Sequence, residues 1–230
     1  MKKLFAIVLS ATLLLMGTQA FAQFSVNAGW LNTTEISRVP NTDPSKTNFN
    51  GFYAGAMYNI PIVAGLGVQP GLTASMLFYK AADSAGNTTI NATISGRYTE
   101  LALNLPINLT YTLEIGDLDV MGYVGPVIQY GLISNTVGNL GVQVGGIGGN
   151  TGDFTTNNFT GVTTDKNGNT SKGDPSRNPF ALYIGVGVHM IVSDAIMVSL
   201  GYEHSLTNIS KVNNEALSRS QIKLGVGYMF

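Results

Sequence analysis

Apolar and polar residues alternate along much of this chain, with the period of two that places neighbouring side chains on opposite faces of a β-strand. Residues 97–111 show the pattern most clearly. Their apolar face carries Leu101, Leu103, Leu105, Ile107, Leu109 and Tyr111, and their polar face carries Tyr98, Glu100, Ala102, Asn104, Pro106, Asn108 and Thr110. A strand of this kind has one face for an apolar environment and one for a polar environment.

Eight segments show this alternation: 24–33, 51–59, 67–80, 97–111, 119–134, 180–192, 195–207 and 218–230. Their connections alternate in length, with 34–50, 81–96, 135–179 and 208–217 long or polar, and 60–66, 112–118 and 193–194 short. Bacterial membrane barrels place long loops outside the cell and short turns in the periplasm. The sequence therefore predicts an all-β fold: an eight-stranded antiparallel up-and-down transmembrane β-barrel with both termini periplasmic.

The alternation alone does not say which face points inward, because a soluble lipocalin-like carrier has the same pattern turned inside out. Segments of ten or more residues suit the height of a lipid band, and Tyr and Phe recur near their ends, as in an aromatic girdle. We interpret the apolar face as the lipid-facing one and keep the soluble carrier as an alternative.

The last eight residues form the most specific segment. Lys223, Gly225, Tyr228 and Phe230 resemble the C-terminal assembly signal of bacterial outer-membrane barrels: a polar residue, Gly two positions later, and aromatic residues at the third-last and last positions. The resemblance implies outer-membrane lipid as surroundings, and the barrel assembly machinery and periplasmic chaperones as partners.

The first residues indicate export. An apolar run over 4–16 follows two lysines, and a small-x-small cleavage site stands at 20–22. We expect residues 1–22 to be a cleaved signal peptide and 23–230 to form one barrel domain.

Composition excludes several classes. Charged residues make up 11% of the chain, against roughly a quarter in an average soluble domain. With no Cys, an exported chain must be held together by burial or by lipid, without disulfides. Once the two N-terminal lysines are removed, ten basic residues face thirteen acidic ones. We therefore expect no nucleic-acid partner.

An eight-stranded barrel leaves an interior just wide enough for side chains. We expect a packed polar lumen with a structural network of Glu100, His189, Glu203, Arg219 and Lys223. Small residues make room for it: Gly29, Gly55, Gly71, Gly125, Gly131, Gly185, Gly187, Gly201, Gly225 and Gly227. A hairpin centred near residue 212 would place Glu203 between Arg219 and Lys223. His189 is expected to be a hydrogen-bonded core residue. Pro70, Pro106 and Pro126 interrupt predicted strands, and we interpret them as bulge positions.

Candidate catalytic chemistry is sparse. The chain has two His and no Ser-His-Asp spacing within a supporting motif. His204, between Glu203 and Ser205, is the one rim cluster an outer-membrane enzyme could use, and we interpret it as polar rim residues. Asp165-Lys166-Asn167-Gly168-Asn169 lacks the spacing of a calcium loop and fits a type I′ hairpin turn better. We expect no catalytic residue, no cofactor and no metal site.

Several short motifs together resemble the outer-membrane β-barrel proteins of Bacteroidetes, often labelled porin family. They are Tyr98-Thr99-Glu100-Leu101, Leu105-Pro106-Ile107-Asn108-Leu109-Thr110-Tyr111, Tyr123-Val124-Gly125-Pro126, and Tyr202 through Leu206-Thr207-Asn208-Ile209. The resemblance covers about residues 20–230. It implies a cell outer-membrane location and this fold, and it names no activity.

Two functions remain open. The first is a non-enzymatic barrel whose surface loops bind a partner or shape the envelope. Loop 135–179 is the main candidate, since loops beyond roughly 15 residues are usually functional or disordered. We expect its flanking strands to extend above the membrane as a hairpin and to present an edge to an unknown ligand. The second is a narrow porin or transport channel. An outer-membrane enzyme is the lesser alternative.

Overall fold

The computed structural model describes residues 23–86, 90–144, 147–192 and 195–230. They form eleven strands: β1 (Gln23–Arg38), β2 (Ser45–Val63), β3 (Leu66–Gly86), β4 (Ile90–Ile115), β5 (Leu118–Val144), β6 (Ile147–Asn157), β7 (Val162–Asp165), β8 (Thr170–Lys172), β9 (Phe180–Val192), β10 (Ile196–Ser205) and β11 (Ala216–Met229). The expected signal peptide, 1–22, lies outside the described residues. No helix within these ranges is long and apolar enough to cross a membrane.

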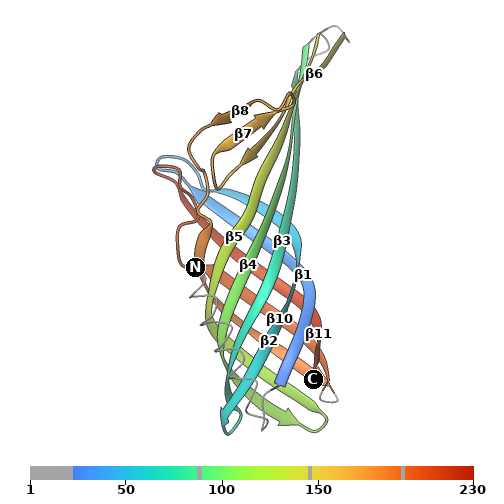
Figure 1. The fold of residues 1–230 in the computed structure, drawn as a ribbon, viewed down its shortest axis with the longest axis vertical. Helices are drawn as coiled ribbons and strands as arrows, with labels where there is room; N and C mark the ends of the chain where they lie inside the picture. Colours follow the sequence, from blue (N-terminus) through green and yellow to red (C-terminus); the bar gives the residue numbers. More distant parts are fainter. Residues whose placement is uncertain (1–22, 87–89, 145–146, 193–194) are drawn as a thin grey trace.

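Eight of the strands close into a barrel (Figure 1). Each pairs antiparallel with its neighbours in the order β1, β2, β3, β4, β5, β9, β10, β11, and β11 pairs with β1 to complete the ring. All eight predicted segments are strands of this barrel, so the prediction of an all-β, eight-stranded antiparallel barrel is confirmed. Closure removes the unpaired edges that an open sheet would expose.

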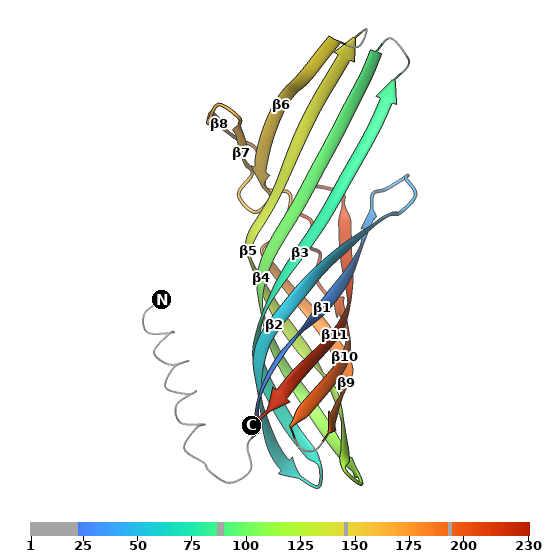
Figure 2. The same cartoon turned by 90° about the vertical axis from the view of Figure 1, so that its right-hand side faces the viewer.

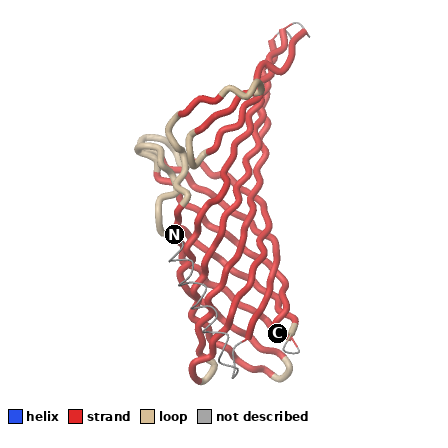
Figure 3. Tube along the Cα trace, in the orientation of Figure 1, coloured by secondary structure: helices blue, strands red, loops and turns tan. Residues whose placement is uncertain are grey.

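The two ends of the barrel differ (Figure 3). At one end, called here the turn end, tight turns join β2 to β3 and β4 to β5, where Gly65 and Gly116 adopt positive φ. The opposite end, the loop end, carries the longer connections 39–44, 158–179 and 206–215. The predicted short connections at 60–66 and 112–118 and the long ones at 34–50, 135–179 and 208–217 thus lie at the two ends as predicted, and the predicted turn at 193–194 lies outside the described residues.

The apolar faces of the strands point outward. Exposed residues of the barrel wall include Leu105, Ile107, Leu109, Val198, Leu200, Leu224 and Val226, whereas Gln69, Asn104, Asn108, Ser199 and Gln221 are buried inside. A soluble carrier would need the reverse arrangement, so the lipocalin-like alternative is wrong.

Outward aromatic side chains gather at two levels of the wall. Phe24, Tyr111, Tyr228 and Phe230 lie near the turn end, and Trp30, Phe52, Phe78, Tyr130, Phe180 and Tyr202 lie nearer the loop end. Tyr and Trp prefer the interfaces of a bilayer because their rings are amphipathic. The two levels therefore match the two faces of a lipid band.

Glycines make room for large rings in the lumen. The hydroxyl of Tyr123 occupies the space that a Cβ atom would need at Gly187 and at Gly201, and the hydroxyl of Tyr53 does the same at Gly225. A larger residue at any of these glycines would displace a ring. The expectation of a lumen filled by side chains beside small residues is thus met.

The prolines are not bulge positions. The pairing register runs past Pro70, Pro106 and Pro126 without a shift. Next to Pro70 and Pro106 the paired residues are interrupted for two positions and then resume in the same register, because Pro removes one donor without adding a residue. The register shifts elsewhere, between Leu101 and Ala102, Leu140 and Gly141, and Pro61 and Val63.

Several strands are longer than predicted. The segment 81–96, expected as a loop, mostly continues β3 and β4, which pair as far as Gly86 and Asn91. β5 continues to Val144 and pairs there with β6. The expectation that both strands flanking 135–179 extend together as a hairpin is wrong, because β9 begins at Phe180 and pairs with β5 only as far as Tyr130. Figure 2 shows β3, β4, β5 and β6 rising together well beyond the other connections of the loop end. We call this four-stranded projection the upper sheet.

Candidate functional site

Two guanidinium groups, one buried and one partly exposed, and two buried carboxylates close the lumen near the loop end. We call Glu35, Glu100, Arg177 and Arg219 the charge cluster. Arg219, 1% exposed, donates to Glu35 from Nε at 3.0 Å and from Nη2 at 2.5 Å, and to Glu100 from Nη1 at 2.6 Å. Arg177 makes a bidentate pair with Glu35, at 2.7 and 2.8 Å. Two positive and two negative charges therefore balance.

Four different parts of the fold supply this cluster: β1, β4, β11 and the connection between β8 and β9. Glu35 of β1 and Arg219 of β11 are direct cross-strand partners. Glu100 on β4 reaches Arg219 from the opposite wall, and the Tyr98 hydroxyl donates a hydrogen bond to it. Because each charge has a partner of opposite sign, the desolvation that would make a lone buried charge costly is offset.

Arg177 comes from the long connection between β8 and β9. Its backbone N–H donates to the Asn158 carbonyl at 3.1 Å, and the residue forms an isolated bridge with Ser210. Its guanidinium lies over the Tyr98 ring, 4.7 Å from the centroid. Segments 157–161, 173–179 and 206–215 thus interlock over the barrel mouth and insert one arginine into it.

A second ion pair lies deeper in the lumen. Lys223 Nζ donates to Glu203 at 2.5 Å, and it stands 5.6 Å from the centroid of the Tyr53 ring. The side chains of Lys223 and Glu203 are 11% and 12% exposed. Glu203 pairs in register with Gln221, as the expected hairpin requires.

The expectation that Arg219 also contacts Glu203 is wrong. Arg219 stands directly opposite Glu35 on the other neighbouring strand, and its donors are taken by Glu35 and Glu100. Glu35 was missed because the predicted strand ended at Thr33, although the inward positions continue with the same period through Glu35. Arg177 lies in a loop, where periodicity gives no signal.

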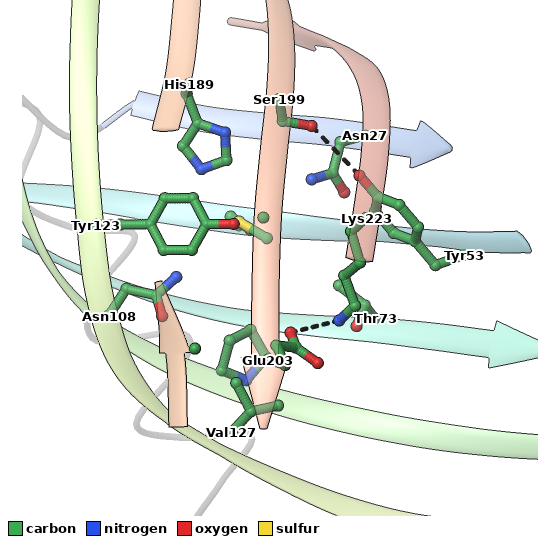
Figure 4. Close-up of a pocket in the computed structure, with 14 residues that line it drawn as sticks. Asn27, Tyr53, Thr73, Asn108, Tyr123, Val127, His189, Ser199, Glu203 and Lys223 are labelled. Carbon is green, nitrogen blue, oxygen red and sulfur yellow. Dashed lines mark hydrogen bonds and ion pairs between the residues drawn. The ribbon is translucent and has the colours of Figure 1, made fainter. Parts of the chain in front are cut away.

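His189 is a core residue, as expected, but it is not hydrogen-bonded to another side chain. It is 1% exposed, and neither ring nitrogen has a partner among the described residues. Its ring stacks on Tyr123 with centroids 4.6 Å apart. Its surroundings are shown in Figure 4.

The side chains of Glu203, His204 and Ser205 do not point toward a common site. Glu203 and Ser205 point into the lumen, where Ser205 Oγ accepts a hydrogen bond from the Arg219 backbone N–H. The His204 Nδ1 atom instead lies 2.9 Å from Ser220 Oγ. In the described part of the chain, no group of three or more His, Cys, Asp or Glu side chains could hold a metal ion.

Above the charge cluster, the loop end is hollowed into an open pocket of about 300 Å³, which we call the vestibule. Its lining residues are Glu35, Ser37, Ser45, Thr47, Tyr98, Thr136, Asn158, Ser176, Arg177, Val212, Glu215 and Leu217. Most of these side chains bond to one another; for example, Ser37 donates to Glu215 at 2.5 Å and Asn158 donates to Thr136 at 3.1 Å. The vestibule is therefore a polar cup with a charged floor.

Beside the upper sheet, β7 and β8 form a small hairpin around Asn167 and Gly168, as expected. The turn is not type I′, because Gly168 has a positive φ of 83° and Asn167 does not. The Asp165 carboxylate accepts hydrogen bonds from the Asn169 side chain and from the backbone of Asn169 and Asn167, which lowers its pKa. The turn keeps these charge-assisted bonds at neutral pH and loses them in acid, as the carboxylate takes up a proton.

A closed ring of strands with an apolar outer band and a charged, packed interior defines a transmembrane β-barrel protein. The family model for the outer membrane protein beta-barrel domain matches residues 5–230. The chain belongs to this family of outer-membrane barrels.

Comparison with curated proteins gives no match. Among solved structures, the chain is similar to the attachment invasion locus protein Ail of Yersinia pestis, with 14% identity, a TM-score of 0.34, and coverage of 92% of this chain and 100% of that one. It is also similar to neisserial surface protein A, with 14% identity, a TM-score of 0.44 and the same coverage. The outer membrane enzyme PagL matches at 5% identity and a TM-score of 0.33, covering 87% of this chain and 98% of that one. Likenesses this distant decide nothing about activity.

Proposed function

We propose that this protein is a non-enzymatic outer-membrane barrel whose segment 135–179, together with the upper sheet, recognises a partner at the cell surface. In this proposal the loop end faces outward and both termini are periplasmic. The main supporting observation is the upper sheet. Its strands rise beyond every other connection of the loop end, although a membrane barrel needs only about 9–11 residues per strand to cross lipid.

The exposed backbone of the upper sheet suits recognition by strand addition. β3 pairs with β2 only as far as Phe78, so its edge from Tyr79 onward has no strand partner within the described residues. On the other side, β6 pairs with β7 only at 154–156. A partner strand added at such an edge would gain backbone hydrogen bonds.

The narrow-channel alternative has less support. The charge cluster and the packed tyrosines fill the lumen, and tyrosine atoms already take up the space beside the inward glycines. We also infer, from the motif resemblance alone, a place among the Bacteroidetes barrels labelled porin family. That label implies no diffusion pore here.

The test shortens the upper sheet without disturbing the mouth. Ala82 pairs with Ser95, and Asn139 pairs with Asp153, so replacing 83–94 and 140–152 by two-residue Asn-Gly turns closes both hairpins on paired residues. The charge cluster and the mouth segments remain. We expect a heat-modifiable, inserted barrel that no longer mediates binding to neighbouring cells or to matrix proteins.

The matched control removes the small hairpin instead. Val162 pairs with Lys172, so replacing 163–171 by Asn-Gly removes a part of 135–179 that lies outside the upper sheet. Because the proposal places the recognition edges on the upper sheet, binding should persist. If the shortened barrel keeps full binding, the proposed function is wrong. If wild type conducts ions steadily and binds nothing, the channel alternative replaces it.

We further infer that the C-terminal residues guide assembly by the barrel assembly machinery and periplasmic chaperones. Tyr228 and Phe230 are exposed on the outer wall, and their rings lie 4.9 Å apart. Replacing both by Ser should greatly reduce the amount of inserted barrel. Phe52→Ser with Phe78→Ser, an outward pair nearer the loop end, should have a much smaller effect. Normal outer-membrane levels of the first variant would contradict the inference.

A further inference from the structure

A small enclosed cavity lies in the middle of the lumen, below the charge cluster (Figure 4). We call it the chamber. Its volume is about 20 Å³, and its polar walls include Asn27, Thr73, Asn108, His189 and Ser199. On the turn-end side, the buried apolar cluster of Met121, Ile191, Met197 and Met229 seals the lumen. The chamber therefore presents polar groups beside the apolar side chains of Met57, Pro106 and Val127, and it lies between the charge cluster and the methionine cluster.

Five buried polar atoms around the chamber have no partner among the described residues: Asn27 Oδ1, Thr73 Oγ1, Asn108 Oδ1, His189 Nδ1 and His189 Nε2. The four residues that carry them are each between 1% and 6% exposed. Leaving a buried polar group unpaired destabilises the fold, because the group loses its bonds to water and gains none in return. Native proteins rarely place several such groups around one space without something to bond them.

Four other polar side chains of the chamber are paired with one another. Tyr53 and Ser199 share a hydrogen bond of 3.3 Å, and Lys223 donates to Glu203 at 2.5 Å. The free atoms thus belong to neutral groups, and the one acid in the chamber wall already has its cation. A charged ligand would find no compensating charge.

The free atoms match the bonding capacity of water. Two amide oxygens need donors, a hydroxyl can donate or accept, and a neutral imidazole offers one N–H and one acceptor nitrogen. A water molecule supplies two donors and two acceptor positions, and it needs a cavity of roughly 10–15 Å³. The chamber is large enough for one.

We propose that the chamber is a built hydration site: at least one ordered water bridges His189, Asn27, Asn108 and Thr73 inside the closed barrel. The centre of the lumen then contains water, although the charge cluster obstructs the lumen on the loop-end side and the methionine cluster obstructs it on the turn-end side. His189 is held neutral between water molecules and the Tyr123 ring, and it serves as a structural residue, neither metal ligand nor catalyst.

The first test asks whether a Thr→Val substitution raises or lowers the unfolding midpoint of the barrel. Thr73 and Thr33 both carry a buried hydroxyl that has no hydrogen-bond partner in the part of the chain that the structure describes, but Thr33 does not line the chamber. Thr→Val replaces the hydroxyl by a methyl group of similar shape, which removes an unpaired dipole where the site is dry. We expect Thr33→Val to raise the unfolding midpoint in detergent by roughly 2–4 °C. Thr73→Val should leave it unchanged or lower it, because it removes a partner of the water. A rise at Thr73 equal to that at Thr33 overturns the proposal.

The second test observes the water directly and does not depend on either variant. The chain has two His, so His204→Gln leaves His189 as the sole imidazole in a ¹⁵N-histidine-labelled barrel. We expect cross-relaxation between the His189 ring protons and a long-lived water in NMR spectra of the barrel in micelles. His189 ring signals without any such cross-relaxation overturn the hydration site.

Discussion

Arg219 is the residue on which the loop end of the lumen depends most. It is fully enclosed and bonded to Glu35 and Glu100, whose side chains are only 4% and 5% exposed. Removing one partner of a buried ion pair leaves the other charge uncompensated, at a cost of roughly 3–5 kcal/mol. We expect Arg219→Met to lower the unfolding midpoint in detergent by on the order of 10 °C.

The control for Arg219 is Arg97→Met on β4. Arg97 is exposed, and substitutions at such sites usually change stability by less than about 0.5 kcal/mol. Circular dichroism melting and the temperature of the heat-dependent gel shift both measure the difference. Equal midpoints for the two variants would show that the cluster does not stabilise the barrel.

Glu203→Gln should also lower the midpoint, but by less than Arg219→Met. The side chains of Glu203 and Lys223 keep more than a tenth of their surface exposed, so water can partly solvate a lone Lys223, and the Tyr53 ring remains beside it. The same melting series ranks the two variants. A larger loss for Glu203→Gln would reverse the order of importance of the two ion pairs.

At the scale of the strand, the bulge in β5 decides which residues enter the lumen near the loop end. Leu101 pairs with Ile133 and Ala102 pairs with Gly131, so Leu132 is the extra residue. Leu132 and Ile133 both face outward, at 46% and 42% exposure, and Ser134 returns inward. There it bonds Tyr98 at 3.0 Å and accepts from Asn158 at 3.1 Å.

Deleting Leu132 should therefore be tolerated. The remaining residues of β5 alternate inward and outward without interruption. The pairing of β5 with β4 then passes Leu101 and Ala102 without a shift of register. Deleting Ile128, in a regular part of the same strand, should block insertion, because a one-residue slip turns every following side chain to the opposite face. Outer-membrane fractionation and heat-modifiability measure both. Equal assembly of the two deletions would mean that register in β5 is not fixed by side-chain facing.

At the scale of the whole molecule, the barrel is a closed cylinder that carries a tall sheet. Arg219 and its partners obstruct the loop end, the tyrosines beside glycines fill the middle, and methionines cover the turn end. We expect the purified barrel to show no steady conductance in planar lipid bilayers and no swelling of sugar-loaded liposomes. Long-lived open levels in single-channel records would contradict this and would restore the transport alternative.

The sequence by itself determined the architecture. Alternation with period two predicted all eight barrel strands, because every strand needs an apolar face toward lipid and an inward face that packs in the lumen. It also placed Glu100, Glu203, Arg219 and Lys223 on the inward face, as their burial shows. Strand ends were less certain, since β3, β4 and β5 continue beyond the lipid band, where alternation no longer has a membrane to mark it.

The tertiary structure decided the partners. Arg219 meets Glu35 and Glu100 because ring closure brings β1 beside β11 and the narrow lumen brings β4 within reach, and sequence distance carries neither fact. Arg177 enters the mouth because loop segments interlock there, with contacts that no periodicity encodes. The unpaired atoms around His189 likewise depend on the tertiary structure, because four strands, β1, β3, β4 and β9, place them around one small space.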